Sequence, residues 1–219
     1  PALVAAARAA RPAVLVHSDA VQAVGKLPVS LRAWGVDMLS VSAHKLGGPA
    51  GVGALVHTRG LGVAPLLRGG AQERGRRPGT EATWLVHGFG LAVELAATEQ
   101  AQRRATMALR RERLLAGVTR LGARIHGDPE HHVGNTLGLA FPGCPGELVM
   151  IALDLEGIAV ATGAACSSGL AEPSPVLRAL GHGREEALEG VRLSLGPATT
   201  DASPTTTASP TASSTTDGS

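Results

Sequence analysis

Short apolar runs separated by small and polar residues fill the first part of the chain. Three of them, residues 13–17, 37–42 and 51–58, have the length and apolar content of strands that are buried on both faces. A helix is predicted over residues 2–10, before the first run, and a helical turn over 20–24, after it. Strands separated by helical connections predict an α/β fold with a mostly parallel sheet.

A helical pattern replaces these runs between residues 83 and 121. Apolar side chains recur there at helical spacing, which predicts one long helix or two joined pieces. Short strands are then predicted at 123–126, 136–141 and 191–195, and helices at 146–155 and 175–180. The second half is therefore predicted to form a smaller α+β domain.

The two ends of the chain differ from its body. Residues 197–219 contain 13 Ser or Thr and three Pro, a composition that cannot bury a core, so a disordered tail is predicted there. The chain starts at Pro1 and opens inside a predicted helix. We therefore expect it to be the C-terminal part of a longer protein.

The composition indicates a globular protein and argues against several classes of partner. Hydrophobic residues make up 44% of the 219 positions and charged residues 17%. The formal net charge of +2 is too small to indicate nucleic acid, and aromatic residues, 2% of the chain, are too few for a base-stacking surface. No run reaches the roughly 18 apolar residues of a membrane span.

The cysteine and histidine patterns predict no metal site. Cys144 and Cys166 form no CxxC motif, which fits neither a disulfide framework nor a zinc ribbon, so a reducing, cytoplasmic location is expected. The adjacent His131 and His132 lack further ligands nearby. Arginines of the helical region are predicted to form a solvated face; they are at positions 103, 104, 110, 111 and 113.

The segment from Ser42 to Gly51 is the sharpest sign of chemistry. The chain has 18 Arg and only two Lys, Lys26 and Lys45, so a lysine here indicates a need for lysine itself. Lysine can lose its proton and form a Schiff base with an aldehyde, which arginine cannot. Lys45 also follows a predicted strand, where ligands bind in open α/β sheets. An exposed loop lysine is the alternative.

Asp19 follows the first predicted strand in the same way. A carboxylate facing a Schiff-base lysine is the arrangement that pyridoxal phosphate requires, because the acid keeps the pyridine nitrogen protonated. Capping of the following turn is the other possible role for Asp19, and both can coexist. Ser42, His44 and the glycines after Lys45 suit a phosphate group.

Three further features are candidates. Cys166 lies in a loop of small residues that leaves a thiol accessible, as a nucleophile requires, whereas Cys144 lies in a turn and is interpreted as structural. Arg192, inside an apolar strand, needs an anion such as a substrate carboxylate, or else faces outward from an edge strand. The basic, glycine-rich loop 69–81 either meets a phosphate or is flexible.

Taken together, these segments resemble the cysteine desulfurases, pyridoxal phosphate enzymes of aminotransferase class V. The matching stretches are HSDAVQAVGKLPV (17–29), DMLSVSAHKLGGPAGVGAL (37–55), GGAQERGRRPGTE (69–81), GAACSSGLAEPSPVLRALG (163–181) and VRLSLG (191–196). The fourth stretch points to the subgroup with a long catalytic-cysteine loop. The resemblance implies the α/β PLP-dependent transferase fold type I, with residues 1–90 in the large cofactor-binding domain and 91–196 as the small domain.

The resemblance also implies a role for each candidate residue. Lys45 would form the Schiff base with pyridoxal 5′-phosphate, and the Cys166 thiolate would attack the sulfur of L-cysteine. Arg192 would bind the carboxylate of that substrate. The remaining cofactor contacts would be Asp19 to the pyridine nitrogen, Gln22 to the ring hydroxyl, Ser42 and His44 to the phosphate, and Thr80 to the phosphate in a neighbouring subunit.

The implied reaction turns L-cysteine into L-alanine and an enzyme persulfide, which passes to an acceptor for iron-sulfur cluster assembly or tRNA thiolation. A homodimer is the expected active form. Because the family's N-terminal part is not in this sequence, we hypothesise that the chain alone binds cofactor weakly or not at all. Another class V enzyme, such as a selenocysteine lyase or an aminotransferase, and a non-catalytic binding module are the alternatives.

Overall fold

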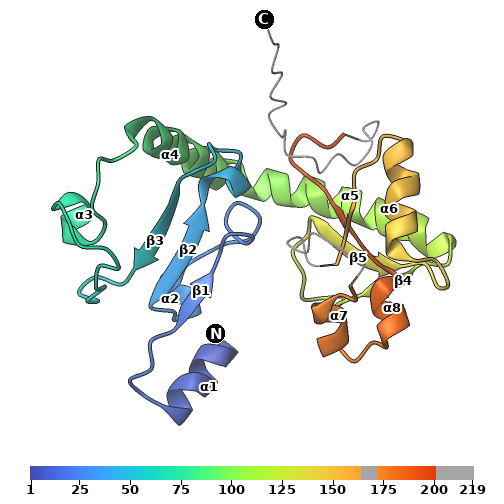
Figure 1. Ribbon diagram of the computed structural model, residues 1–219, viewed down its shortest axis with the longest axis horizontal. Coiled ribbons are helices and arrows are strands. Elements are labelled where there is room, and N and C mark those ends of the chain that lie inside the picture. The colour runs from blue at the N-terminus through green and yellow to red at the C-terminus, as the bar shows by residue number, and fades with distance from the viewer. Residues whose placement is uncertain (164–171, 201–219) are drawn as a thin grey trace, which may run out of the picture. The chain divides into compact units, whose positions relative to one another are not determined.

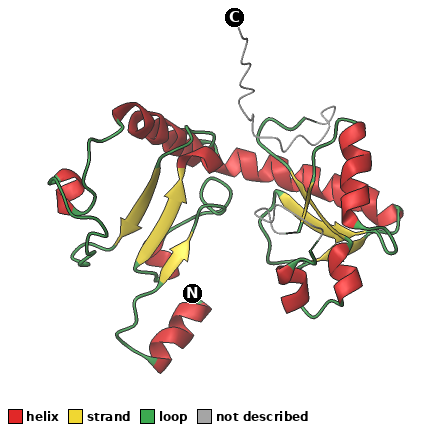
Figure 2. Ribbon diagram, viewed as in Figure 1, coloured by secondary structure: helices red, strands yellow, loops and turns green. Residues whose placement is uncertain are grey.

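The computed structural model describes residues 1–163 and 172–200, which belong to two compact units, Pro1–Gln102 and Arg103–Ser219. Figure 1 labels their elements and Figure 2 shows that each unit combines helices with a small sheet. The α/β prediction is confirmed. The helix α5 (Gln100–Arg120) begins at the end of the first unit and continues into the second.

The first unit contains a three-stranded sheet in the order β1-β2-β3. Its strands are β1 (His17–Asp19), β2 (Met38–Ser42) and β3 (Gly53–His57), and a short 3-10 helix, η1 (Ala43–Leu46), follows β2 directly. Its helices are α1 (Ala2–Ala10), α2 (Leu31–Trp34), α3 (Gln72–Gly75) and α4 (Thr83–Thr98). Strands β1 and β2 are parallel, with Asp19 opposite Ser40, whereas β2 and β3 are antiparallel.

Three predictions about this sheet are wrong. The sheet is mixed instead of mostly parallel, because the chain returns along β2 to make β3. The first strand covers residues 17–19 and not 13–17, since the amide groups of Asp37 and Met38 bond to the carbonyl of Val16 and pairing starts there. Burial on both faces is also wrong: His17 and Asp19 of β1 are exposed, and so are Gly53 to Val56 of β3.

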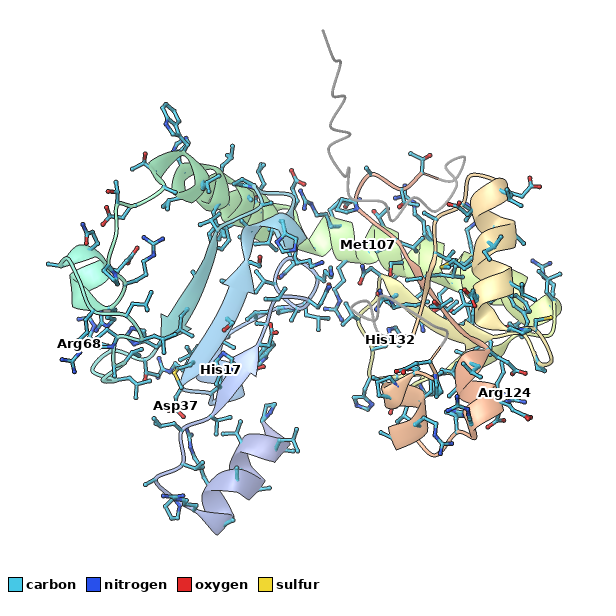
Figure 3. All side chains as sticks on the ribbon, viewed as in Figure 1. His17, Asp37, Arg68, Met107, Arg124 and His132 are labelled. Atoms are coloured by element: carbon cyan, nitrogen blue, oxygen red, sulfur yellow. The ribbon has the colours of Figure 1, made fainter. Side chains whose placement is uncertain are left out.

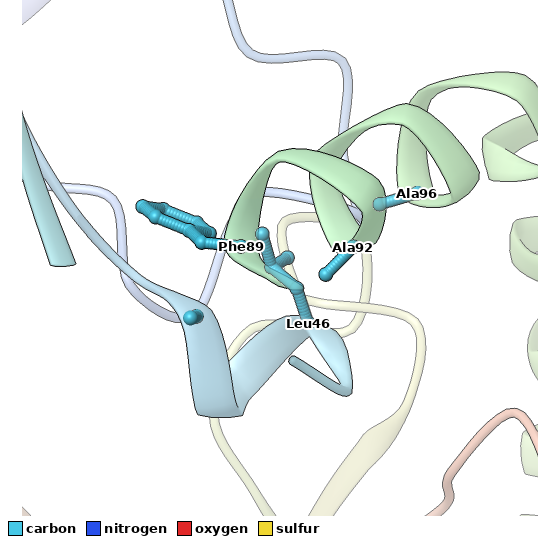
Figure 4. Packing of buried hydrophobic residues seen from close by; sticks show 5 residues of the cluster. Leu46, Phe89, Ala92 and Ala96 are labelled. Carbon is cyan, nitrogen blue, oxygen red and sulfur yellow. The ribbon is translucent and has the colours of Figure 1, made fainter. Parts of the chain in front are cut away.

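The core of the first unit joins η1 to α4. Ala43 and Leu46 of η1 pack against Phe89, Ala92 and Ala96, which follow one another at helical spacing (Figure 4). This packing fixes the segment that carries His44 and Lys45.

A second cluster holds the sheet to α1. Val4, Ala20, Val36 and Leu39 are all buried there. The ion pair between Arg8 and Asp37 lies beside this cluster, with Nη2 3.0 Å from Oδ2. Figure 3 labels Asp37 next to His17, at the start of β2 and β1.

The second unit has a four-stranded antiparallel sheet in the order β4-β5-β7-β6. The strands are β4 (Arg124–His126), β5 (Thr136–Ala140), β6 (Ala161–Thr162) and β7 (Gly190–Ser194), and the helices are α6 (Gly146–Leu155), α7 (Pro175–Ala179) and α8 (Arg184–Leu188). Residues from β5, β7 and α5 form its core: Val118, Leu137, Leu139, Val191 and Leu193.

Helix boundaries follow local capping chemistry. Ser174 accepts a bond from the amide of Leu177, and Pro175 occupies the first turn of α7, where its missing N–H costs nothing.

Among the described residues, none of the helices has the combined length and apolar character needed to cross a membrane.

Candidate active site

Asp19 and Lys45 follow the carboxyl ends of two adjacent parallel strands. Strand β1 ends at Asp19 itself, and β2 ends at Ser42, directly before η1 with His44 and Lys45. Because β1 and β2 are parallel, both ends lie at the same edge of the sheet. Asp19, His44 and Lys45 are exposed there. The structure therefore forms the sheet edge that the sequence predicted as a ligand site.

The carboxylate of Asp19 caps the turn that follows it. Its Oδ1 accepts a hydrogen bond from the amide of Val21 at 2.9 Å. The second oxygen, Oδ2, has no hydrogen bond within the described part of the chain. The capping role is thus present, and one oxygen is still available for a ligand.

A hydroxyl and an imidazole are linked at the end of β2. The Oγ of Ser42 lies 2.8 Å from the Nδ1 of His44. The following η1 ends at Gly47, whose φ of 86° is left-handed and whose N–H bonds to the carbonyl of Ala43. This bond keeps the Ser42–His44 pair and Lys45 on one short, fixed turn.

Lys26 approaches the same edge. Its Nζ donates a hydrogen bond to the Oε1 of Gln22, which leaves the amide NH₂ of Gln22 as a free donor within the described residues. Burial lowers the pKa of Lys26 first, and the charge of Lys45 lowers it further. The only two lysines of the chain therefore lie within electrostatic range of each other, a pairing that the sequence analysis did not predict.

Asp37 fixes the strands behind this edge. Its Oδ2 accepts a hydrogen bond from the amide of Val16 at 2.8 Å, and both of its oxygens accept bonds from Arg8. The bond from Val16 contributes most to lowering the pKa of Asp37, and Arg8 adds to it against the opposing effect of burial. His17 and Ser40 make a further cross-strand contact of 2.8 Å.

Thr80 lies in an exposed loop that is held by its own side chains. The Oε1 of Gln72 accepts a bond from the amide of Gly79 at 3.2 Å, and Arg77 donates bonds to the carbonyl groups of Gly79 and Thr80. The loop bends at Glu73 and Arg74, which both have positive φ. The Thr80 side chain is thereby presented outward.

Arg192 lies on the central strand β7 and lines a pocket of about 380 Å³ in the second unit. The edge-strand alternative is wrong, because β7 is paired with β5 on one side and β6 on the other. Arg192 is half-buried, and its guanidinium has no hydrogen bond or ion pair within the described residues. His126, Thr136 and Ser174 are the other polar side chains of the lining, which includes no described Asp or Glu.

The remaining candidates are the two cysteines and the adjacent histidines His131 and His132. Cys166 falls outside the described residues, and Gly163, just before it, lines the Arg192 pocket. Cys144 is an exposed free thiol in a turn closed by the bond from its amide to the carbonyl of Phe141. His131 contacts Asp128 at 3.3 Å, and the described residues contain no group of three His, Cys, Asp or Glu suited to a metal ion.

One of the arginines predicted to be solvated is buried. Arg111 is only 6% exposed, and its guanidinium donates to the carbonyl of Thr136 and pairs with Glu112. The buried face of α5 also contains Met107 and Val118, so Arg111 sits at a core position and satisfies its charge locally.

Comparisons of the sequence and of the structure with known proteins point to the same family. Residues 1–203 match the family model described as Aminotransferase class-V. A cysteine desulfurase of Rhodobacter capsulatus is 48% identical over 203 residues, 92% of this chain and 52% of that protein. A cysteine desulfurase of Gluconacetobacter diazotrophicus is 45% identical over 190 residues, 86% of this chain and 48% of that protein.

A solved structure titled as a NifS-like protein superposes with a TM-score of 0.82 at 36% identity and covers 91% of this chain and 52% of the other. The chain thus spans about half the length of the curated relatives it matches. The order of motifs, the sheet edge with Lys45 and these matches agree, and the chain belongs to the class-V aminotransferase family.

Proposed function

We propose that the protein is a pyridoxal phosphate-dependent cysteine desulfurase. The carrying observation is the set of groups at one sheet edge: the Lys45 amine, the Asp19 carboxylate and the Ser42–His44 pair, in a chain 48% identical to a cysteine desulfurase. The reaction converts L-cysteine and the Cys166 thiol into L-alanine and a Cys166 persulfide. These products balance without an external oxidant or reductant.

The donor set at this edge fits pyridoxal phosphate. The cofactor presents an aldehyde, a basic ring nitrogen, a ring hydroxyl and a phosphate. The edge supplies an amine at Lys45, a carboxylate oxygen at Asp19 and an amide donor at Gln22. Hydroxyl and imidazole groups suited to the phosphate come from Ser42 and His44. Each group of the cofactor therefore has a matching side chain.

When bound, pyridoxal phosphate would supply an electron-accepting ring. The free oxygen of Asp19 would hold the proton of the ring nitrogen, while its other oxygen stays bonded to Val21. Lys45, on the fixed turn of η1, would move the α-proton of the substrate with its amine. Gln22 would orient the ring through its amide NH₂, because Lys26 occupies the amide oxygen.

Arg192 is assigned to the carboxylate of L-cysteine. Its guanidinium has no acidic partner in the described lining of its pocket, and a half-buried cation of this kind favours a bidentate carboxylate. The thiolate of Cys166 then attacks the substrate sulfur. A sulfur–sulfur bond forms, the carbon–sulfur bond breaks, and its electron pair stays with the carbon that becomes the methyl group of alanine.

The active form is proposed to be a homodimer that passes its persulfide to an acceptor protein. The exposed Thr80, on a loop stiffened by Gln72 and Arg77, supports a contact to the cofactor phosphate of a second subunit. The acceptor would serve iron-sulfur cluster assembly or tRNA thiolation, as the sequence resemblance implies.

The chain alone is expected to bind the cofactor weakly or not at all, so the test first joins it to the N-terminal half of a relative. It then supplies pyridoxal phosphate and L-cysteine and measures L-alanine together with the mass of the Cys166 peptide. We expect alanine to form and the peptide to gain one sulfur atom. Cys166→Ala should abolish both, and Cys144→Ala, a change at the other cysteine, should leave both intact. Alanine formation that survives Cys166→Ala would overturn the sulfur-transfer step, and transamination retained in that variant would indicate an aminotransferase.

A further inference from the structure

His126, Gly138 and Arg192 form one row across the sheet of the second unit. His126 is opposite Gly138 in the β4–β5 pair, and Gly138 is opposite Arg192 in the β5–β7 pair. Residues directly opposite each other in a sheet project from the same face. Leu137 and Leu139, on either side of Gly138 in β5, project from the opposite face of the sheet, into the core. The imidazole and the guanidinium therefore face one side, where both line the pocket.

Gly138 keeps the space between these two side chains open. A Cβ at this position would lie 3.6 Å from the Cβ of His126, in ordinary contact, so any longer side chain would fill the gap. Two strand spacings of about 4.8 Å separate the backbones of His126 and Arg192. A ligand bound to the guanidinium above Gly138 thus has the imidazole as its neighbour.

His126 lacks a polar partner. Both of its ring nitrogens are buried, and neither has a hydrogen bond within the described residues. Native proteins rarely leave such atoms unpaired, so a buried imidazole without a partner is a candidate ligand contact. The pocket that the ring lines, at about 380 Å³, has the size of a small-molecule site.

Burial and the neighbouring positive charges together lower the pKa of His126, which favours the neutral ring at neutral pH. Burial lowers the pKa of His126 first, followed by the charges of His182 and Arg124, while Glu186 and Glu189 act in the opposite direction more weakly. A neutral imidazole offers one N–H donor and one acceptor nitrogen. It can therefore donate to a carboxylate without adding a second positive charge.

His182 holds the far side of the ring. The two ring centroids are 4.7 Å apart in a T-shaped arrangement. His182 is itself fixed, because Arg178 donates to its carbonyl at 2.7 Å and Glu186 lies 3.5 Å from its Nδ1. Glu186 also pairs with Arg124, which Figure 3 labels beside α8. His126 also lines the pocket, on the same face of the sheet as Arg192.

We propose that His126 is a second contact of the Arg192 pocket and that the two residues together bind the carboxylate of an amino-acid ligand. The inference rests on the proposed function, since it takes Arg192 as the carboxylate contact. It adds a specificity-determining residue, because a ligand without a carboxylate loses both the charge of Arg192 and the acceptor for His126.

The test is a titration of the ¹⁵N-labelled protein with L-alanine, the unreactive product, without added cofactor. Binding is followed by saturation transfer to the alanine methyl group and by the ring ¹⁵N shifts of His126. We expect both signals to respond to L-alanine and neither to L-alaninamide, which has no carboxylate. His126→Phe should weaken binding about tenfold, the effect of losing one hydrogen bond to a charged group. His126→Asn, which keeps a donor, should recover most of that loss.

His132→Phe is the matched control, because His132 is an exposed histidine of the same unit. The His132→Phe protein should bind L-alanine with the same affinity as the unchanged chain. Binding that depends on Arg192 but is unchanged in His126→Phe, with no ring shift, would overturn the role of His126 and leave the proposed function standing. Binding that survives Arg192→Leu, or equal binding of L-alaninamide, would overturn the carboxylate site itself. The ring shifts of the unchanged chain decide the question even where a variant fails to fold.

Discussion

Lys26 and Lys45, the only lysines of the chain, lie close enough in the fold for the charge of Lys45 to lower the pKa of Lys26. Lys26 is also bonded to Gln22, so this lysine links two residues assigned to the cofactor. The chain places arginine at its 18 other basic positions, which makes the pairing of its two lysines specific to this edge of the sheet.

Removal of the charge at position 45 is expected to raise the pKa of Lys26. Protonated Lys26 then meets less repulsion, while burial, the larger cause of the lowering, still keeps its pKa below the ordinary value of 10.5. Competitive labelling of the amine across a pH series, read by mass spectrometry, gives the midpoint in Lys45→Met. Lys45→Arg retains the charge and should leave the midpoint in place. An unchanged midpoint in Lys45→Met would show that the two amines do not interact.

Asp37→Asn is expected to lower the Tm of the protein near neutral pH. The pKa of Asp37 is below its ordinary value of 3.8, so the stability it contributes is present above that value and is lost as the pH falls through the folded pKa. The Tm curves of the variant and the unchanged protein should therefore converge in acid. Asp154→Asn removes an exposed carboxylate and is expected to leave the curve unchanged. A constant Tm difference down to the acid limit would contradict the assignment.

The elements that the sequence predicted well are those with long or strongly periodic patterns. The helices α4 and α5 lie where the helical spacing placed them, and their separation at Glu99 matches the second of the two predicted alternatives, two joined pieces instead of one long helix. Strand β6 is 2 residues long and helix α8 is 5 residues long, so neither is long enough to show a periodic pattern in the sequence. The first strand was misplaced because its pairing is set by Val16, which bonds to residues far along the chain.

The site was predictable only as far as topology determines it. Asp19 and Lys45 each follow an apolar run, and parallel pairing then brings them to one edge. Sequence spacing carries no comparable signal for the T-shaped pair of His126 and His182 or for the burial of Arg111. These contacts arise from strand register and helix rotation, which are fixed by packing of the whole unit.

Leu139→Ala is expected to destabilise the second unit by about 2–5 kcal/mol. Leu139 is 1% exposed between β4 and β7, so truncation leaves a cavity that its neighbours cannot fill. Hydrogen exchange read by mass spectrometry should become faster in β4, β5 and β7 and stay unchanged in β2. Leu155→Ala, at a position 83% exposed, should change the stability by less than about 0.5 kcal/mol. Equal effects of the two variants would mean that Leu139 is not a core residue.

Gly48→Ala is expected to loosen the packing of η1 on α4. The added Cβ would lie 3.0 Å from the Cβ of Ala92 and 3.1 Å from the carbonyl oxygen of Ala43, so one of the elements must shift, at a cost of about 1–3 kcal/mol. Thermal unfolding measures the loss. Gly62→Ala is the matched control, because a Cβ there meets nothing within 4 Å. A Tm equal to that of the control would show that η1 accommodates the methyl group without moving.

Mixing two inactive variants tests whether Thr80 acts on a second subunit. In a dimer of one Lys45→Ala chain and one Thr80→Ala chain, the site with the intact Lys45 receives Thr80 from the Lys45→Ala chain and is complete. Co-refolded mixtures of the two variants, each joined to the N-terminal half of a relative, should therefore regain cysteine-to-alanine turnover, up to about one quarter of the unmutated level for random pairing and equal chain stability. If Thr80 served its own subunit, that site would carry the Thr80→Ala change, and mixing would restore nothing. The exposed position of Thr80, on a loop braced by Arg77 and Gln72, favours the first outcome.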